Sequence, residues 1–245
     1  MLSIDTAITV FINSFARRWW TLDAFVCLLA ANHLFKGGLV MAVFCFNWFR
    51  SGESAEARQF IEKRMILLYS VLICIPGLLA TRWLAAVLPF RERPLFIALL
   101  HMRRAYTFDS DALDRWSSFP SDHAVLFFAL STGMYLVNKK AGVFLYLYTI
   151  LGVALPRIFL GIHYPTDILA GATLGVLLGY SAKWFAWRSI VAGPVLRLQE
   201  FSPGIFYACF FFLVYQTADL YGPLRGGVQV AEEIFHVWLK AIHSA

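Results

Sequence analysis

The stretch WSSFPSDHAVLFFAL, residues 116–130, places two ionisable side chains, Asp122 and His123, directly before an apolar run. Pro120 and Ser121 form a helix start signal, because serine can cap a first turn. No charged residue follows between positions 124 and 137. The stretch therefore predicts an apolar helix whose first turn carries ionisable groups where membrane meets water.

The composition of the chain is that of a membrane protein. Of its 245 residues, 60% are hydrophobic, 17% aromatic and only 15% charged. The apolar residues gather into segments of roughly 17 to 25 positions, long enough to cross a bilayer as helices. Crossings are expected at about residues 34–49, 66–88, 124–137, 142–158, 168–187 and 205–220. The predicted fold is all-α, a single membrane-embedded domain over residues 1–245 with about six transmembrane helices.

Amphipathic helices are predicted at both ends of the chain. Residues 1–20 are expected to lie on the membrane surface, with Trp19 and Trp20 as interfacial anchors. Residues 224–245 show a second apolar helical face, interpreted as a surface helix, with a partner site as the alternative. The apolar positions of the first helix recur at helical spacing: Ile4, Ile8, Phe11, Ile12 and Phe15.

The loops fall on two sides of the membrane, because every crossing reverses the chain. One side receives more Lys and Arg residues, and the positive-inside rule makes it cytoplasmic. The other side receives residues 90–120 and 157–167. The formal charge of +6 could suggest nucleic acid, but the basic residues lie in short loops between apolar segments. Membrane lipids are therefore the expected partners, and no nucleic acid is expected.

Three polar stretches meet on that second side: residues 91–94 (RERP), 120–123 (PSDH) and 156–167 (PRIFLGIHYPTD). His163 and Asp167 are four residues apart, so a helix that begins near Pro165 brings the carboxylate within reach of the imidazole. Such a carboxylate can fix the tautomer of a histidine and raise its basicity. Alternatively, Asp167 only occupies a first helical turn, where negative charge is favoured.

Arginines and a helix start predict a phosphate site beside these histidines. The free amides of a helix N-terminus attract anions, and the planar fork of arginine suits phosphate oxygens. Arg82 falls inside a predicted crossing, where a charge is costly and usually functional. No cysteine pair or histidine stands at metal-ligand spacing, so no metal or other cofactor is expected.

These residues resemble the type 2 phosphatidic acid phosphatases, integral-membrane lipid phosphatases with the motifs KxxxxxxRP, PSGH and SRxxxxxHxxxD. The third motif is present as Arg157, His163 and Asp167 at the family spacing, with Pro156 in place of serine. The second has Asp122 where the family usually has glycine. Its negative charge would weaken phosphate binding unless an arginine pairs with it.

The first motif is incomplete. Arg93 and Pro94 are retained, but Ala86 stands at the lysine position. Arg82 or Arg91 could supply the missing charge, and the sequence does not choose between them. The departures from the family pattern bear on substrate choice more than on the class of reaction.

The resemblance implies a two-step phosphoryl transfer without metal. His163, oriented by Asp167, would attack phosphorus and form a phosphohistidine, while His123 acts as general acid and then as general base. The remaining site residues are expected at the substrate phosphate: Arg93, Arg157, Ser121, Arg82 and Asp122.

The resemblance also suggests a lipid phosphate substrate, foremost undecaprenyl diphosphate at the outer face of a bacterial inner membrane. Phosphatidic acid, phosphatidylglycerol phosphate and lipid A phosphates stay open, as do a lipid phosphotransferase and an inactive phospholipid-binding or transport protein. The sequence gives no oligomeric state. Headgroup selection is expected in the loop of residues 90–116, which carries Arg103, Arg104, Tyr106 and Asp109.

Overall fold

The computed structural model describes residues 3–50, 57–106, 108 and 116–222. Within these ranges every regular element is helical, which confirms the predicted all-α class. The α-helices are α1 (Ile4–Asn13), α2 (Trp20–Ala31), α3 (Leu39–Arg50), α4 (Ala57–Leu72), α5 (Cys74–Val87), α6 (Asp122–Val137), α7 (Lys139–Tyr148), α8 (Leu155–Phe159), α9 (Pro165–Tyr180), α10 (Phe185–Phe201) and α11 (Pro203–Ala218). Short 3-10 or π segments are η1 (Leu34–Gly38), η2 (Pro94–Phe96), η3 (Ala98–Leu100), η4 (Thr149–Ala154) and η5 (Ser181–Lys183).

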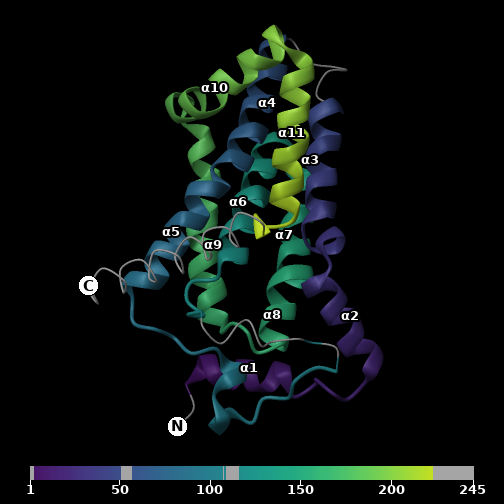
Figure 1. Ribbon diagram of the computed structural model, residues 1–245, viewed down its shortest axis with the longest axis vertical. Helices are drawn as coiled ribbons and strands as arrows, with labels where there is room; N and C mark the ends of the chain where they lie inside the picture. Colours follow the sequence, from purple (N-terminus) through teal and green to yellow (C-terminus); the bar gives the residue numbers. More distant parts are fainter. Residues whose placement is uncertain (1–2, 51–56, 107, 109–115, 223–245) are drawn as a thin grey trace, which may run out of the picture.

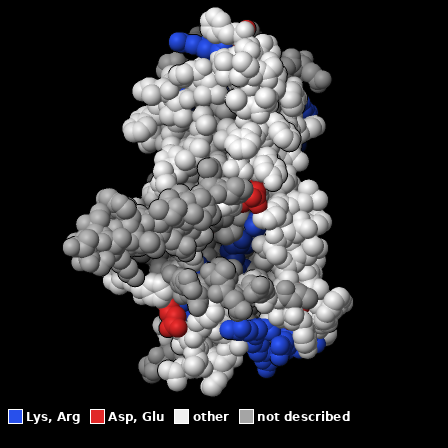
Figure 2. Space-filling view, viewed as in Figure 1, with Lys and Arg blue, Asp and Glu red and all other residues white. Residues whose placement is uncertain are grey.

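Helices α3, α4, α6, α9 and α11 run roughly along the long axis of the molecule, whereas α10 crosses its upper end and α1 lies across its lower end (Figure 1). Figure 2 shows a wide uncharged surface over the upper part of this face, with Lys and Arg side chains at its top edge and again in its lower half. An uncharged band between charged ends is the surface that a bilayer requires of a spanning bundle.

Each predicted crossing has a helix at its place, although the helices differ in length. By length and composition, two described stretches can span a membrane, namely Gln59–Val87 with 29 residues and Lys139–Phe159 with 21. The number rises to four if each of two bent helix pairs counts as one span, and α6 and α11 are shorter apolar helices. In the first bent pair, the short helix α2 precedes η1 and α3, and the two parts meet at 65°.

The second bend corrects the boundary of the fifth crossing. We expected one helix through residue 187, but α9 ends at Tyr180 and α10 leaves at 77°. Trp184 breaks the helix, because its backbone is extended, with φ −78° and ψ 112°. Arg188 then binds Glu62 of α4 at 3.3 Å, which directs α10 back across the bundle. Average hydropathy along residues 168–187 contains no sign of this turn.

The close packing of α6 against α9 positions the site. Gly171, Gly175 and Gly179 of α9 are four residues apart, and each faces the backbone of α6. A Cβ added at Gly171 would lie 2.5 Å from the carbonyl oxygen of Ser121. Small residues at this spacing let two helices approach closely in a membrane. The starts of α6 and α9 therefore lie together, and Ser121 N donates to Asp167 O at 3.2 Å.

Helix α1 turns its polar side towards the protein. Ile4 and Phe11 on the apolar side are 82% and 66% exposed, whereas Thr9 and Asn13 are buried. Asn13 Nδ2 donates to the carbonyl oxygen of Phe159, at the end of α8, over 2.8 Å. The apolar side is thus free for the membrane surface, as expected for a helix within residues 1–20. The predicted tail helix of residues 224–245 lies outside the described residues.

Candidate active site

The turn between α8 and α9 carries His163. Gly161 has a φ of +69°, the left-handed region that favours glycine, and it lets the chain reverse directly before the histidine. Leu95 N donates to the carbonyl oxygen of Gly161 at 2.9 Å. This bond fastens the segment that follows Arg93 to the turn that carries His163, so two of the polar stretches are joined through their backbones.

The ring of His163 is buried and oriented by a backbone carbonyl. Its Nδ1 lies 2.8 Å from the carbonyl oxygen of Ser118. A carbonyl oxygen only accepts hydrogen bonds, so Nδ1 carries the ring proton in this contact and Nε2 keeps a lone pair. Asp167 Oδ2 lies farther from Nδ1, at 3.6 Å, an ion-pair distance rather than a hydrogen bond. Ser118, which the sequence did not suggest, thus makes the contact expected of Asp167.

Burial lowers the pKa of His163. The carboxylate of Asp167 acts in the opposite direction, and the charge of Arg93 adds to the lowering, with a net pKa below the ordinary value. The imidazole is therefore neutral at neutral pH. A neutral ring with a lone pair on Nε2 is the form of histidine that can act as a nucleophile.

Asp167 is fully buried at the start of α9, and both of its oxygens have donors. Oδ2 accepts from the backbone N of Tyr164 at 2.8 Å, which caps the helix. Oδ1 accepts from Arg91 Nη1 at 2.5 Å. The two interpretations of Asp167 left open by the sequence are compatible, because one carboxylate serves the helix start and lies beside His163.

At the start of α6, the three polar residues take different partners. Ser121 is the N-cap, and its Oγ accepts from Ala124 N at 3.5 Å. Asp122 Oδ1 lies 2.8 Å from His123 Nδ1, and Asp122 Oδ2 accepts from Arg82 Nη2 at 2.8 Å. Arg82 also stacks on the ring of Trp116, 4.5 Å from its centroid. An arginine therefore does pair with Asp122, which was the condition for phosphate binding beside it.

The two arginines that match the family motifs are buried beside the histidine turn. Arg93 Nη1 donates to the carbonyl oxygen of Ile162 at 2.8 Å, and its Nε donates to Trp116 O at 3.2 Å. Arg157 lies on α8, and its Nη1 donates to Val153 O at 2.9 Å. Buried cations near the membrane are costly, and the charge of Arg93 acts on His163, so these buried arginines indicate a site for an anion.

Arg91 connects the site to α1. Its Nη2 contacts Asp5 Oδ2 at 2.5 Å, while Nη1 contacts Asp167. Thr166 donates to Asp5 through both its backbone N, at 3.0 Å, and its Oγ1, at 2.6 Å. Burial alone would raise the pKa of Asp5, but the hydrogen bonds from Thr166 and Arg91 outweigh it and lower the pKa. Both candidates for the missing motif charge are thus paired with carboxylates, Arg82 with Asp122 and Arg91 with Asp5 and Asp167.

Sequence reasoning missed the role of Asp5, although a signal was present. Asp5, Thr9 and Asn13 recur every four residues and form one polar face on an otherwise apolar helix. A polar face on a surface helix ordinarily points to water or to lipid headgroups. Here this face lies against α8 and the start of α9.

The predicted headgroup loop is tied to the N-terminal segment. Arg103 N donates to Asn13 Oδ1 at 2.7 Å, and Tyr106 N donates to Asp23 Oδ2 at 3.2 Å. Arg17 Nε donates to the carbonyl oxygen of Arg104 at 2.8 Å. The fourth expected residue, at position 109, lies outside the described residues. The described part of this loop therefore shares a layer with α1 below the bundle (Figure 1).

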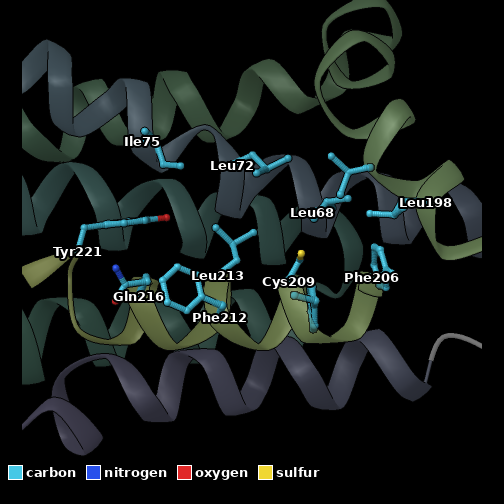
Figure 3. Close-up of a pocket in the computed structure, with 12 residues that line it drawn as sticks. Leu68, Leu72, Ile75, Leu198, Phe206, Cys209, Phe212, Leu213, Gln216 and Tyr221 are labelled. Carbon is cyan, nitrogen blue, oxygen red and sulfur yellow. The ribbon is translucent and has the colours of Figure 1, made fainter. Parts of the chain in front are cut away.

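An apolar pocket of about 320 Å³ lies apart from these polar residues, between α4, α5, α10 and α11. Figure 3 shows Leu68, Leu72 and Ile75 facing Leu213 and Phe206 across it. Its lining includes none of the predicted site residues. In the part of the chain that the structure describes, no cluster of three or more His, Cys, Asp or Glu residues could hold a metal ion.

The arrangement can accept and transfer a phosphoryl group. It combines a neutral histidine that presents Nε2, a second histidine against a carboxylate, two buried arginines and a helix start. These are the groups that a nucleophile, an acid and an oxyanion site require.

Comparisons with known proteins found one matching family and several similar proteins. Residues 63–190 match the model of the family described as the PAP2 superfamily. The bacitracin transport permease protein BcrC of Bacillus licheniformis is 42% identical over 84 residues, which are 34% of this chain and 41% of that protein. Undecaprenyl-diphosphatase BcrC of Bacillus subtilis is 29% identical over 119 residues, 49% of this chain and 57% of that protein. The chain thus spans about half the length of these curated relatives. The crystal structure of Aquifex aeolicus LpxE matches 75% of this chain and 97% of its own, with 22% identity and a TM-score of 0.48.

Proposed function

The chain belongs to the PAP2 superfamily, and we propose that it is an integral-membrane phosphatase that removes the terminal phosphate of a lipid diphosphate, undecaprenyl diphosphate. The observation that carries this proposal is the 2.8 Å contact between His163 Nδ1 and the Ser118 carbonyl. It leaves Nε2 with the lone pair that a phosphohistidine mechanism needs.

In the first step, His163 Nε2 attacks the terminal phosphorus, so that a P–N bond forms while the bond from phosphorus to the leaving oxygen breaks. His123 gives its proton to that oxygen, and the lipid monophosphate leaves. Asp167, at 3.6 Å from Nδ1, favours the positive charge that develops on the His163 ring.

In the second step, water attacks the phosphohistidine. His123, now without its proton, takes one from the water as the new P–O bond forms and the P–N bond breaks. Inorganic phosphate is released, and both histidines regain their starting protonation. The same acid and base therefore serve both steps, as microscopic reversibility requires.

The charge on the equatorial phosphate oxygens would be met by Arg93 and Arg157, with Ser121 and Arg82 at the edge of the site. Guanidinium groups can supply the electrostatic stabilisation for which other phosphatases use a divalent ion. We propose, on this basis, that the protein acts without metal, and activity in EDTA tests the point.

Two observations support the proposed substrate and the proposed side of the membrane. A relative that is 29% identical over 119 residues is named an undecaprenyl-diphosphatase. The site lies at the end of the bundle that the positive-inside rule assigns to the outside, because Lys139, Lys140 and Lys183 lie in the turns at the other ends of α6, α7 and α9. We therefore place the active site at the outer face of a bacterial inner membrane, within one domain that covers residues 1–245.

The test is phosphate release by the protein purified in detergent, with EDTA present. Undecaprenyl diphosphate is offered beside phosphatidic acid and phosphatidylglycerol phosphate, and His163→Gln is compared with wild type. His33→Gln is a matched control, because His33 is an exposed histidine that pairs with Asp219 away from the site. We expect release that His163→Gln loses and His33→Gln keeps, and release that is fastest from undecaprenyl diphosphate.

Other outcomes would redirect the proposal. Activity lost in EDTA and restored by magnesium would contradict the metal-free mechanism. Faster release from another lipid would change the substrate and keep the class. Phosphate transferred to an added lipid or sugar hydroxyl would identify a transferase, and no turnover of any of these substrates would favour a phospholipid-binding protein.

A further inference from the structure

Asp122 differs from the residue that the PSGH motif has at its place, and it sits at the centre of a chain of contacts. Its Oδ1 lies 2.8 Å from His123 Nδ1 and also accepts from the backbone N of His123 at 2.8 Å. Its Oδ2 pairs with Arg82 Nη2 at 2.8 Å. Both carboxylate oxygens thus have close partners, and both side chains of the Asp122–His123 pair are less than one-fifth exposed.

We propose that Asp122 is a positioning residue for His123, a role that rests on the phosphatase function proposed above. An ionised carboxylate can only accept, so Nδ1 of His123 donates to Oδ1 in this contact. Nε2 is then the ring nitrogen that exchanges a proton with the substrate oxygen. Because the ring is held through Oδ1 and the helix through the backbone N, the carboxylate fixes the orientation of the ring relative to the start of α6.

The same contact sets the charge of the acid. A carboxylate beside an imidazole favours the protonated ring, which is the form that a general acid needs at the start of the reaction. His123 thereby differs from His163, whose Nδ1 meets a neutral carbonyl at hydrogen-bond distance. The group at hydrogen-bond distance from Nδ1 separates the two roles: it is a carboxylate for His123, the proton carrier, and a carbonyl for His163, the neutral nucleophile, whose carboxylate neighbour Asp167 lies farther away at 3.6 Å.

Arg82 completes this unit. Its guanidinium binds Asp122 Oδ2 and stacks on Trp116, so it is held on two sides. Its positive charge cancels the negative charge that Asp122 would otherwise present to an incoming phosphate. This assigns Asp122 to His123 rather than to the phosphate, because a carboxylate has no proton to donate to phosphate oxygens.

Several other charged groups act on the same region and must be considered in any pH experiment. Arg93 lies within electrostatic range of Asp122, Arg82 and Asp167. His163 lies within range of Arg93, Asp167 and Asp122. Of these, only His163 and His123 are expected to change charge between about pH 5 and 8. The acid side of a rate profile therefore reports His163, and the alkaline side reports the loss of the His123 proton.

The test compares wild type with Asp122→Asn, which keeps the size of the side chain and removes its charge. With undecaprenyl diphosphate we expect kcat to fall by about ten- to a hundred-fold. KM should change by less than about three-fold, because Asp122 is not a phosphate ligand in this scheme. The alkaline limb of the kcat profile should move to lower pH by about one unit or more. Asp122→Glu should restore part of kcat and return the limb towards its wild-type position.

Asp219→Asn is the matched control, because it also removes a carboxylate from a histidine, His33, but away from the site. It should leave kcat and the limb unchanged. A large rise in KM with an unmoved limb in Asp122→Asn would overturn the proposal in favour of a phosphate contact. If Asp122→Asn unfolds, seen as a loss of helical circular dichroism, the kinetic comparison is made with Asp122→Glu. The protonation of the His123 ring nitrogens in wild type, described next, then decides.

A measurement that does not need turnover separates this proposal from the phosphatase function itself. Nitrogen-15 shifts of the His123 ring, assigned by comparison with His123→Gln, report which nitrogen carries the proton. We expect Nδ1–H in wild type when the ring is neutral, and a mixed or reversed tautomer in Asp122→Asn. A proton on Nε2 alone in wild type would overturn the proposal even in an active enzyme. Absence of phosphatase activity with Nδ1–H present would instead count against the function.

Discussion

Gly171 lies where α9 comes closest to the start of α6, so Gly171→Ala should separate the two halves of the site. The added Cβ would lie 2.5 Å from the carbonyl oxygen of Ser121 and 2.8 Å from Ala124 Cβ. These distances are roughly 1 Å inside ordinary van der Waals contact, and a backbone oxygen cannot rotate away. The helices must therefore move apart at the level of Ser121, whose N–H donates to Asp167 O.

The expected cost follows from that displacement. Overpacking of this kind typically destabilises a protein by about 1–3 kcal/mol. A shift of about 1 Å between reacting groups can lower the rate by about a hundred-fold. Gly171→Ala should thus lose about ten- to a hundred-fold in kcat/KM while most of the protein stays folded at moderate temperature.

Two further glycines provide internal comparisons. A Cβ at Gly179 would lie 2.5 Å from Ala129 O, the same clash two helical turns farther from the site. Gly179→Ala should lower thermal stability about as much as Gly171→Ala and cost less activity. Gly193→Ala in α10 is the neutral control, because nothing lies within 4 Å of its Cβ position. It should be neutral or raise helix stability by about 0.5–1 kcal/mol.

The assay is phosphate release from undecaprenyl diphosphate in detergent, with thermal unfolding followed by circular dichroism on the same samples. Activity of Gly171→Ala within two-fold of wild type would refute the reasoning. So would equal losses of activity in Gly171→Ala and Gly179→Ala, because distance from the site would then have no effect.

Two further substitutions and the pH dependence of activity and stability probe the arginines and the nucleophile. Asp5→Asn removes the charge that holds Arg91 Nη2, and this charge-assisted hydrogen bond is worth about 1–2 kcal/mol because it is partly exposed. If all of that energy serves to position Arg91, kcat/KM should fall about five- to thirty-fold. Thr6→Ala on the same helix is the control and should have little effect. Arg157→Lys keeps the charge but loses the planar fork, and kcat/KM should fall about ten-fold or more; an unchanged value would remove Arg157 from the phosphate site. The pKa of His163 is lowered from the ordinary value of about 6.5, so the fall of kcat/KM on the acid side should have its midpoint below about pH 6.5. The profile is measured with at least two substrates. A midpoint above that pH would contradict a neutral nucleophile. Thermal stability should fall below the same pH, since the unfolded chain then binds the proton more readily than the fold does.

Much of the fold could be predicted from the sequence because apolar runs and start signals act locally. Ser121 caps α6 and Pro165 begins α9, both as expected from the residue types. The turn into α10 was missed because it depends on Trp184 and on the contact of Arg188 with Glu62, 126 residues earlier in the chain. A hydropathy window contains no information on a partner so distant.

The site was predicted as a set of residues but not as a set of contacts. His123, His163, Asp167, Arg93 and Arg157 stand in motifs, and spacing along the chain brings each to the same end of the bundle. The groups that orient them could not be deduced in the same way. Ser118 acts through its backbone carbonyl, so the identity of its side chain carries no signal.

The glycine spacing in α9 was a signal that sequence reasoning left unused. Gly171, Gly175 and Gly179 predict a close helix contact, and the structure shows that the partner is α6. Asp5 was missed for a different reason. The polar face of a surface helix predicts only that polar groups or water lie against it. Water would be as good a partner for Asp5 as Arg91 and Thr166, so the sequence could not identify these two residues.

The most direct test of the mechanism is to trap the phosphoryl group on the protein. Undecaprenyl diphosphate labelled with phosphorus-32 in its terminal phosphate is mixed with wild type for times shorter than one turnover, and with His123→Ala, in which both steps should be slowed. Alkali-quenched protein is digested and analysed for phosphohistidine by mass spectrometry. We predict acid-labile label on Nε2 of His163, absent from His163→Gln. Label on another residue, or release of phosphate with no labelled protein in any variant, would contradict a phosphohistidine at His163.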